Sequence, residues 1–279
     1  MTDALRKRHA ILLRDAVRME AYAAALRTVV RPGDVIADLG CGLGALAFMA
    51  LRAGAQHVHA IDVEPETLAL AMDQATREGL ASRITFHQGL AQTVAVPEQV
   101  DLIVTETLGS LALDENMLPL LIDARQRWLK PGGRMIPQDV TITFAPIARK
   151  FPRHLHAYHH ASITDDEYLG TPVSAPMVTF ANRRRASWAF QTTLPVARNG
   201  ILQGFAGWFT LRLTEKVAFS TAPDAPPTHW EQGMLPLRKP QPVRAGDAID
   251  FVIGIEPDPD NLHSIIEYDF LVRPADRNR

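Results

Sequence analysis

A glycine-rich turn at residues 40–44 constrains the fold of this sequence more than any other stretch. An apolar run from residue 35 ends in Asp38, glycines then occupy alternate positions, and a helix-forming stretch follows. This order predicts a strand, a tight turn and a helix. Glycines let the backbone approach a ligand without a Cβ in the way, and the helix presents free N–H groups at the same spot. We expect the turn to bind a nucleotide.

Two acidic residues flank the turn. Asp62 ends a second apolar run about 20 residues on, where a carboxylate at the C-terminal edge of a strand accepts hydrogen bonds from both ribose hydroxyls. Asp38 favours S-adenosylmethionine, because a carboxylate suits an ammonium or sulfonium group and repels a pyrophosphate. A turn without any ligand is one alternative. Another is a dehydrogenase, since the dinucleotide pattern is also satisfied by Gly40, Gly42 and Ala45.

Strands and helices continue to alternate after the turn. The patterns predict helices at 43–52, 65–78 and 117–129, and strands at 57–61, 84–86, 102–105 and 134–136. Such alternation requires a parallel, doubly wound α/β sheet of the Rossmann-like type. Ligands in these sheets bind beyond the C-terminal ends of the strands. One crevice is therefore expected to collect Asp38, Asp62, residues 88–92 and Glu106.

An amphipathic helix is predicted before the turn, at residues 4–30. Asp15, Arg18 and Tyr22 are spaced so that successive members face the same way, and Arg18 is placed to reach a ligand carboxylate. The alternative for these residues is an ordinary solvated charged face.

The character of the chain changes after Pro137. Helical periodicity disappears, and short apolar runs at 140–144, 205–213, 249–255 and 265–272 alternate with turns. This pattern predicts an all-β barrel or sandwich. We therefore expect two domains, a nucleotide-binding domain at 1–137 and a β domain at 138–279.

Composition excludes several classes of function. The net charge of −2 gives no basis for binding nucleic acid or an anionic membrane through bulk electrostatics. Cys41, as the single cysteine, excludes an internal disulfide and a four-cysteine zinc site. Neither a signal peptide nor an apolar run of membrane-spanning length is recognised. The expectation is a cytoplasmic protein.

Two further clusters carry weaker predictions. The histidines at 154, 156, 159 and 160 match no zinc spacing and have no evident acidic partner, so an exposed, partly helical segment without a metal is expected. Residues 183–185 are all arginine and are expected to form a solvated turn, with a patch for acidic ligands as the alternative.

A pair of glutamates is the strongest candidate for chemistry. Glu106 follows a buried-type strand, and Glu115 lies nine residues later across a loop that can fold back. Adjacent carboxylates raise each other's pKa unless a cation lies between them. A guanidinium fits, being planar, permanently charged and matched to carboxylates through paired N–H bonds. The alternative is that Glu106 caps the crevice while Glu115 is solvated.

The sequence resembles the protein arginine methyltransferases along most of its length. The similar segments are "HAILLRDAVRMEAYAAA", "VIADLGCGLGAL", "ITFHQGLAQTVAVPEQVDLIVTETLG" with the glutamate pair, and "ARQRWLKPGGRMIPQ". The most specific match is "VAFSTAPDAPPTHWEQ", which resembles the Thr-His-Trp loop of the family. The resemblance implies a methyltransferase domain followed by a β-barrel that helps to bind the substrate.

The resemblance also implies roles for individual residues. S-adenosylmethionine would be held by Arg18 at its carboxylate, by Asp62 at the ribose, and elsewhere by Asp38, Gly40, Gly42, Ala91 and Gln92. Glu106 and Glu115 would bind the substrate guanidinium and align its nitrogen with the methyl group. His229 would pair with Asp15 beside the site and help to accept the proton. Trp230 would pack behind the glutamates.

Several positions depart from the family pattern. The paired tyrosines before the first helix are absent, Leu12 replaces a methionine, and residues 105–110 lack the usual aromatic and methionine neighbours. The segment 150–176 is shorter than the dimerisation arm of the family, so a homodimer is an open prediction.

The combined interpretation is methyl transfer to arginine in a protein, a peptide or the free amino acid. Two alternatives stay open. One is a methyltransferase for another small amine or hydroxyl, and the other is a cofactor-binding scaffold without turnover.

Overall fold

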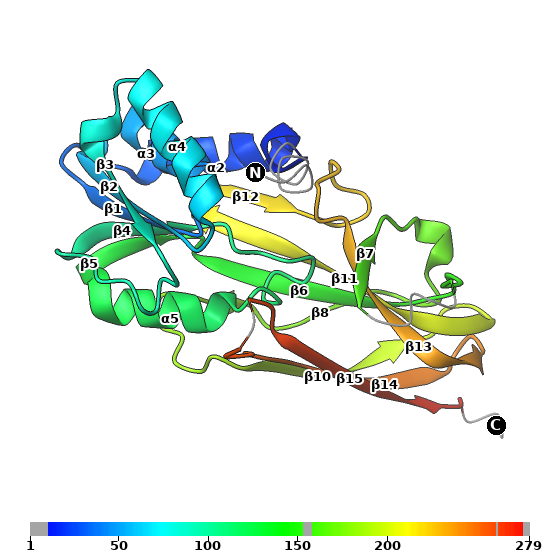
Figure 1. Ribbon diagram of the computed structural model, residues 1–279. Helices are drawn as coiled ribbons and strands as arrows, with labels where there is room; N and C mark the ends of the chain where they lie inside the picture. The colour runs from blue at the N-terminus through cyan, green and yellow to red at the C-terminus, as the bar shows by residue number, and fades with distance from the viewer. Residues whose placement is uncertain (1–10, 153–157, 261, 276–279) are drawn as a thin grey trace.

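The computed structural model describes residues 11–152, 158–260 and 262–275. Figure 1 shows a parallel sheet with helices at one end of the molecule and long antiparallel strands at the other. The predicted fold class, a Rossmann-like domain followed by an all-β domain, is confirmed. Within the described residues no helix is long and apolar enough to cross a membrane.

The parallel sheet has the strand order β3-β2-β1-β4-β5. Its strands are β1 Val35–Leu39, β2 His57–Asp62, β3 Ile84–Gln88, β4 Val100–Thr105 and β5 Leu129–Ile136. All five residues of β1 are buried, as expected for a central strand covered on both faces. Because the strand order reverses between β1 and β4, the ligand crevice is expected beside the end of β1.

Helices cover both faces of this sheet. They are α2 Ala16–Val29, α3 Ala45–Arg52, α4 Pro65–Arg77 and α5 Met117–Trp128, with a short 3-10 turn at Ala81–Arg83. In Figure 1, α2, α3 and α4 lie along one face and α5 along the other. These elements match the predicted positions within a few residues.

Two local predictions were inaccurate. The predicted first helix is interrupted at Asp15, which caps the N-terminus of α2, while residues 11–14 form a separate helical stretch. Residues 4–10 of that prediction lie outside the described part of the chain. The strand predicted at 134–136 begins earlier, at Leu129, and its pairing with β4 shifts between Val100 and Leu102. The glycines there allow this irregular pairing.

The second half of the chain forms two antiparallel sheets, of order β7-β13-β11-β6-β8 and β10-β14-β15. Strands β12 and β9 pair with β11 and β6. The bounds are β6 Asp139–Ile147, β7 His159–Ala161, β8 Val173–Ser174, β9 Val178–Thr179, β10 Trp188–Pro195, β11 Gly200–Thr214, β12 Val217–Ser220, β13 Gln232–Val243, β14 Ala248–Glu256 and β15 Ile265–Arg273.

Aromatic side chains fill the space between the two antiparallel sheets. Phe144 of β6 packs against Trp188 of β10 and Phe251 of β14. Phe205 of β11 also contacts Phe251, with the ring centroids 4.5 Å apart. Such pairs bury large apolar surfaces, and they hold the two sheets face to face.

Candidate active site

The acidic residues that were predicted to share one crevice lie together at the C-terminal edge of the parallel sheet. Asp38 and Asp62 lie at the ends of β1 and β2, and Glu106 follows the last residue of β4. Asp38 is level with Ala60 on one side and Val104 on the other. Parallel pairing thus brings three acidic residues, from separate parts of the sequence, to one edge.

The glycine turn is held tightly against this edge. The N–H of Cys41 donates to the carbonyl of Ile61 at 2.9 Å, and the N–H of Gly42 donates to Asp62 Oδ2 at 2.7 Å. Gly40 has a φ of 68°, and a Cβ there would lie 2.7 Å from Thr107 Cγ2. A glycine is therefore required at this position, both for its backbone conformation and for the space.

Asp38 is the least satisfied polar group of the crevice. Its side chain is fully buried, and neither carboxylate oxygen makes a hydrogen bond within the described residues. Burial raises the pKa of Asp38 to about 7, the backbone N–H of Ala47 opposes the rise although it lies outside hydrogen-bond geometry, and the nearby Asp62 carboxylate adds to the rise. A buried carboxylate without a partner indicates a ligand that supplies a positive group.

Asp62 is suited to a ribose. Its two oxygens accept hydrogen bonds from the backbone N–H groups of Gly42 and Glu64, at 2.7 and 2.9 Å. Each oxygen keeps a lone pair, and the side chain is only partly buried. Two hydroxyl donors from a ligand can therefore bind there. After β3, Ala91 is buried, Gln92 is exposed, and the carbonyl of Ala91 accepts a hydrogen bond from Arg127.

Arg18 makes an ion pair that the sequence analysis missed. Its Nε donates to Glu106 Oε2 at 2.7 Å, its Nη2 contacts the same oxygen, and its Nη1 donates to the carbonyl of Leu12 at 2.9 Å. Burial raises the pKa of Glu106, whereas the charges of Arg18 and His229 oppose the rise. The resemblance assigns Arg18 to the carboxylate of the cofactor and Glu106 to the substrate guanidinium, so a contact between them was not expected. No feature of the sequence indicated that these two residues, 88 positions apart, would pair with each other.

Asp15 links the first helix to the β half of the molecule. Its Oδ2 accepts the backbone N–H of His229 at 2.9 Å and lies 2.7 Å from His229 Nδ1. Its Oδ1 accepts the backbone N–H of Arg18 at 2.9 Å. Burial alone would raise the pKa of Asp15, but the bonds from His229 and Arg18 hold it below its usual value. The contact between Asp15 and His229 is the one that the resemblance implies.

Trp230 joins the β half to the loop between the glutamates. Its indole Nε1 donates to the carbonyl of Leu108 at 2.6 Å, and Ser110 Oγ donates to the carbonyl of Trp230 at 2.6 Å. The rings of His229 and Trp230 are in contact, with centroids 4.0 Å apart. The loop that follows β4 is thus fixed from the β side.

Glu115 lies at the other end of this loop and is partly buried. Its neighbour Asn116 donates from Nδ2 to the carbonyl of Asp258 at 2.9 Å and accepts the backbone N–H of Asp258 at 3.1 Å. The structure therefore brings Asp15, Arg18, Glu106 and His229 into direct contact. It places Glu115 on the same loop, next to a residue that is bonded to the β half.

The histidine cluster differs from the expectation. His159 and His160 belong to strand β7 rather than to a helical segment. His160 Nδ1 lies 2.8 Å from Glu231 Oε2, so an acidic partner exists, although Glu231 is distant in sequence. In the described part of the chain, no group of three potential ligands is close enough to hold a metal. His154 and His156 lie outside the described residues.

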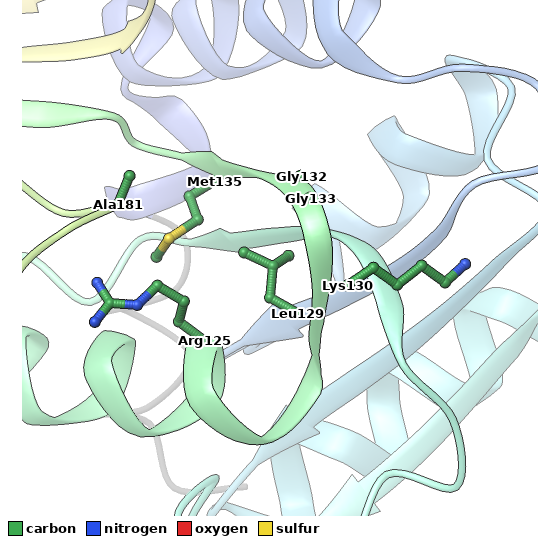
Figure 2. Close-up of a pocket in the computed structure, with 7 residues that line it drawn as sticks. All are labelled: Arg125, Leu129, Lys130, Gly132, Gly133, Met135 and Ala181. Carbon is green, nitrogen blue, oxygen red and sulfur yellow. The ribbon is translucent and has the colours of Figure 1, made fainter.

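The arginine triplet lies in an irregular segment that follows a turn at 181–182, and Arg184 and Arg185 are exposed. Arg183 donates to the carbonyls of Arg185 and Ser187, and Arg125 of α5 donates to the carbonyl of Arg183. Arg125 also lines a pocket of about 260 Å³. Figure 2 shows its lining residues, Arg125, Leu129, Lys130, Gly132, Gly133, Met135 and Ala181. The first residues of β5 line it, at the sheet edge opposite to Glu106. This pocket is therefore separate from the crevice.

The charges of the crevice favour a cationic ligand. Four carboxylates, those of Asp15, Asp38, Asp62 and Glu106, are opposed by Arg18 and by His229 when it is protonated. An anionic pyrophosphate would be repelled by this arrangement. The geometry thus argues against the dehydrogenase alternative and fits an ammonium, a sulfonium or a guanidinium.

Comparisons with known proteins agree with this site. Residues 36–133 match a methyltransferase domain family, and residues 175–271 match the arginine methyltransferase oligomerization subdomain. The chain is 26% identical to the ribosomal protein arginine N-methyltransferase rmt3 of Schizosaccharomyces pombe, over 88% of this chain and 52% of that protein. It is 29% identical to an arginine N(omega)-methyltransferase of Streptomyces achromogenes subsp. streptozoticus, over 88% of this chain and 75% of that protein.

A solved structure extends the likeness to the fold. Arginine methyltransferase 10 of Arabidopsis thaliana matches with a TM-score of 0.84 and 22% identity, over 97% of this chain and 94% of that one. The fold is therefore that of the arginine methyltransferase structures, and the class shown for residues 36–133 is a methyltransferase domain. More narrowly, the chain is similar to protein arginine methyltransferases along most of its length, and residues 175–271 match their oligomerization subdomain. It spans about half the length of the Schizosaccharomyces pombe relative.

Proposed function

We propose that this protein transfers a methyl group from S-adenosylmethionine to a guanidino nitrogen of arginine. The observation that carries the proposal is a buried, acidic sheet edge, where Asp38 lacks a hydrogen-bond partner and Glu106 directly follows β4. These two carboxylates match the positive charges of a sulfonium donor and a guanidinium acceptor.

The residues present fit the cofactor. Asp38 would lie near its positive groups, Asp62 would accept the ribose hydroxyls, and Gly40 and Gly42 would allow the backbone to approach. Arg18 would bind its carboxylate, and Ala91 and Gln92 would flank the adenine. When bound, the cofactor supplies an electrophilic methyl group on its sulfonium. The side chains of this protein would bind and orient the acceptor and take up its proton.

Glu106 and Glu115 are proposed to bind the guanidinium. Carboxylates on the far nitrogens localise the positive charge there and leave the near nitrogen free to react in line. The proton lost afterwards passes to Glu106, whose pKa is raised by burial, or to His229, which Asp15 orients. Trp230 holds the loop that carries Glu106.

The acceptor is proposed to be arginine within a protein, in a peptide or as the free amino acid. The names of two relatives suggest a protein acceptor and arginine itself, since one is named for ribosomal protein and the other for arginine. The match of residues 175–271 to an oligomerization subdomain supports a homodimer. We also propose a reducing compartment such as the cytoplasm, given the single cysteine.

The test combines binding with product analysis. Calorimetry should show binding of S-adenosylmethionine, and mass spectrometry should show methylated product from arginine or an arginine peptide. Glu106→Gln should lower kcat by about 100-fold or more, because a group that orients the guanidinium is lost. Glu78→Gln makes the same change at an exposed site on the helix end and serves as the control.

Four outcomes would contradict the proposal. A protein that does not bind S-adenosylmethionine, or a Glu106→Gln variant with the full rate, would exclude this mechanism. Methylation of other amines or hydroxyls, with none on guanidines, would favour the broader small-molecule enzyme. Binding of the cofactor without methylation of any tested acceptor would favour a scaffold.

A further inference from the structure

Asp114 is a buried carboxylate next to Glu115 that the proposed reaction does not use. Its side chain is 5% exposed. Oδ2 accepts the hydroxyl of Tyr158 at 2.6 Å, and Oδ1 accepts the backbone N–H of Leu111 at 3.0 Å. Within the described residues no lysine or arginine forms an ion pair with it. A buried carboxylate persists only where hydrogen bonds compensate for its lost hydration.

The Asp114 carboxylate fills the inside of the loop between the two glutamates. A Cβ added at Gly109 would overlap it, so the backbone of the first half of the loop rests on this side chain. Ala112 and Asn116 have positive φ angles of 62° and 50°. Residues other than glycine keep such conformations only where the surroundings fix them. The path of the loop therefore depends on contacts around Asp114.

Tyr158 brings the β half of the molecule to this carboxylate. A Cβ at Gly233 of β13 would lie 3.1 Å from the Tyr158 ring, so the ring packs directly on that strand. Ser264, also from the β half, donates its N–H to the carbonyl of Asp114 at 2.9 Å and its hydroxyl to the carbonyl of Leu113 at 3.1 Å. Side chain and backbone of Asp114 are thus both bonded to the β half.

We propose that Tyr158 and Asp114 are positioning residues for Glu115, an inference that rests on the proposed function. The hydroxyl of Tyr158 holds the Asp114 carboxylate inside the loop. That contact sets the backbone from which Glu115 reaches the guanidinium. Neither residue touches the reacting atoms, and both act through Glu115.

The first test is Tyr158→Phe, which removes one hydroxyl and keeps the ring. We expect kcat/KM for the guanidino acceptor to fall about 10- to 100-fold, because Asp114 loses a hydrogen bond and the loop relaxes. The Kd for S-adenosylmethionine should stay within about twofold. Tyr268→Phe is the matched control, since its hydroxyl donates at the same distance of 2.6 Å to the carbonyl of Pro236, away from the loop.

If Tyr158→Phe folds poorly, a second set of variants and a second measurement still test the inference. Asp114→Asn keeps the size and one acceptor, so it should lose less activity than Asp114→Ala. Asp114→Asn combined with Tyr158→Phe should lose little more activity than Tyr158→Phe alone, since the two residues act through one contact. Hydrogen exchange of the amides at 111–115 should accelerate in Tyr158→Phe and not in Tyr268→Phe.

The inference is overturned if Tyr158→Phe matches the wild type within twofold, or if Tyr268→Phe loses as much activity. Weakened cofactor binding in Tyr158→Phe would also overturn it, because that points to a general structural role. If the wild type methylates no guanidine, the proposed function fails. Hydrogen exchange then decides separately whether Tyr158 holds the loop.

Discussion

At the scale of single residues, Asp38 connects ligand binding to pH. Its folded-state pKa of about 7 lies above the usual 3.8, so the folded protein retains a proton that the unfolded chain releases. The ionised carboxylate therefore costs stability as pH rises from about 4 to 7. A cation bound beside Asp38 removes this cost, because it favours the charged form.

We expect the affinity for S-adenosylmethionine to rise by up to about tenfold per unit between pH 5 and 7, and to level off above pH 7. Below pH 7 the free protein must lose the Asp38 proton on binding, so calorimetry at pH 6 in buffers of different ionisation enthalpy should report proton release.

Asp38→Asn removes the titrating group and should flatten this profile. Asp73→Asn, on the exposed side of α4, should leave the slope unchanged. An equally steep profile in Asp38→Asn would show that another group carries the pH dependence.

At the scale of elements, the start of α2 couples helix stability to the site. Asp15 caps the helix through the N–H of Arg18 and also binds His229. Asp15→Ala should lower the free energy of unfolding by about 1–2 kcal/mol, because an unsatisfied helix N–H remains. Asp15→Asn keeps a good cap and should stay close to the wild type in denaturant titrations.

The two variants separate the cap from the chemistry. Both remove the charge beside His229, so both should shift the pH profile of kcat. If Asp15→Asn is as unstable as Asp15→Ala, the charge rather than the cap stabilises this helix.

Strands β2 and β3 carry a second pH-dependent feature. His59 is buried, with Nδ1 3.1 Å from His87 Nε2 and Nε2 3.5 Å from Glu98 Oε1, and its ring contacts that of His57. Burial lowers the pKa of His59. As pH drops, His59 is therefore protonated in the unfolded chain before it is protonated in the folded protein. The free energy of unfolding falls as pH drops below about 6.5.

We expect the melting temperature to fall by several degrees between pH 7.5 and 5.5, and to fall less in His59→Phe, which cannot take up a proton. His160→Phe, at an exposed histidine, serves as the control. If the melting temperature of His59→Phe falls as much as that of the wild type, groups other than His59 cause the acid sensitivity.

At the scale of the whole molecule, the candidate active site depends on contacts between the two halves of the chain. The loop that carries the glutamates belongs to the parallel-sheet half, yet Trp230, Tyr158 and Ser264 bind it from the β half. Because these contacts join the two halves of the chain, one substitution among them is expected to change both folding and catalysis.

Trp230→Phe tests this coupling. The carbonyl of Leu108 loses its donor, so the free energy of unfolding should fall by about 1–3 kcal/mol and kcat/KM should fall with it. Trp208→Phe removes a buried indole that stacks on Tyr168 instead, and it should lower stability alone. Equal activity loss in both variants, measured well below their melting temperatures, would show that Trp230 has no specific effect on the loop.

Much of this site could be predicted from the sequence, for identifiable reasons. Parallel strands place their C-terminal residues at one edge, so alternation alone brought Asp38, Asp62 and Glu106 together. The ion pair of Arg18 and Glu106 was not predicted. The two residues lie 88 positions apart, and no local pattern indicates whether each binds the other or a ligand. The partner of His160 was missed for the same reason. The roles assigned to individual site residues remain predictions.

The sequence by itself determined the fold class, the glycine turn and the acidic edge, because periodicity and turn residues act over short distances. Only the tertiary structure decided how the glutamate loop is held. Asp114 is bonded to Tyr158, 44 residues away, and Trp230 is bonded to Leu108, 122 residues away. Contacts of that range follow from how two packed halves meet, and no local pattern encodes them.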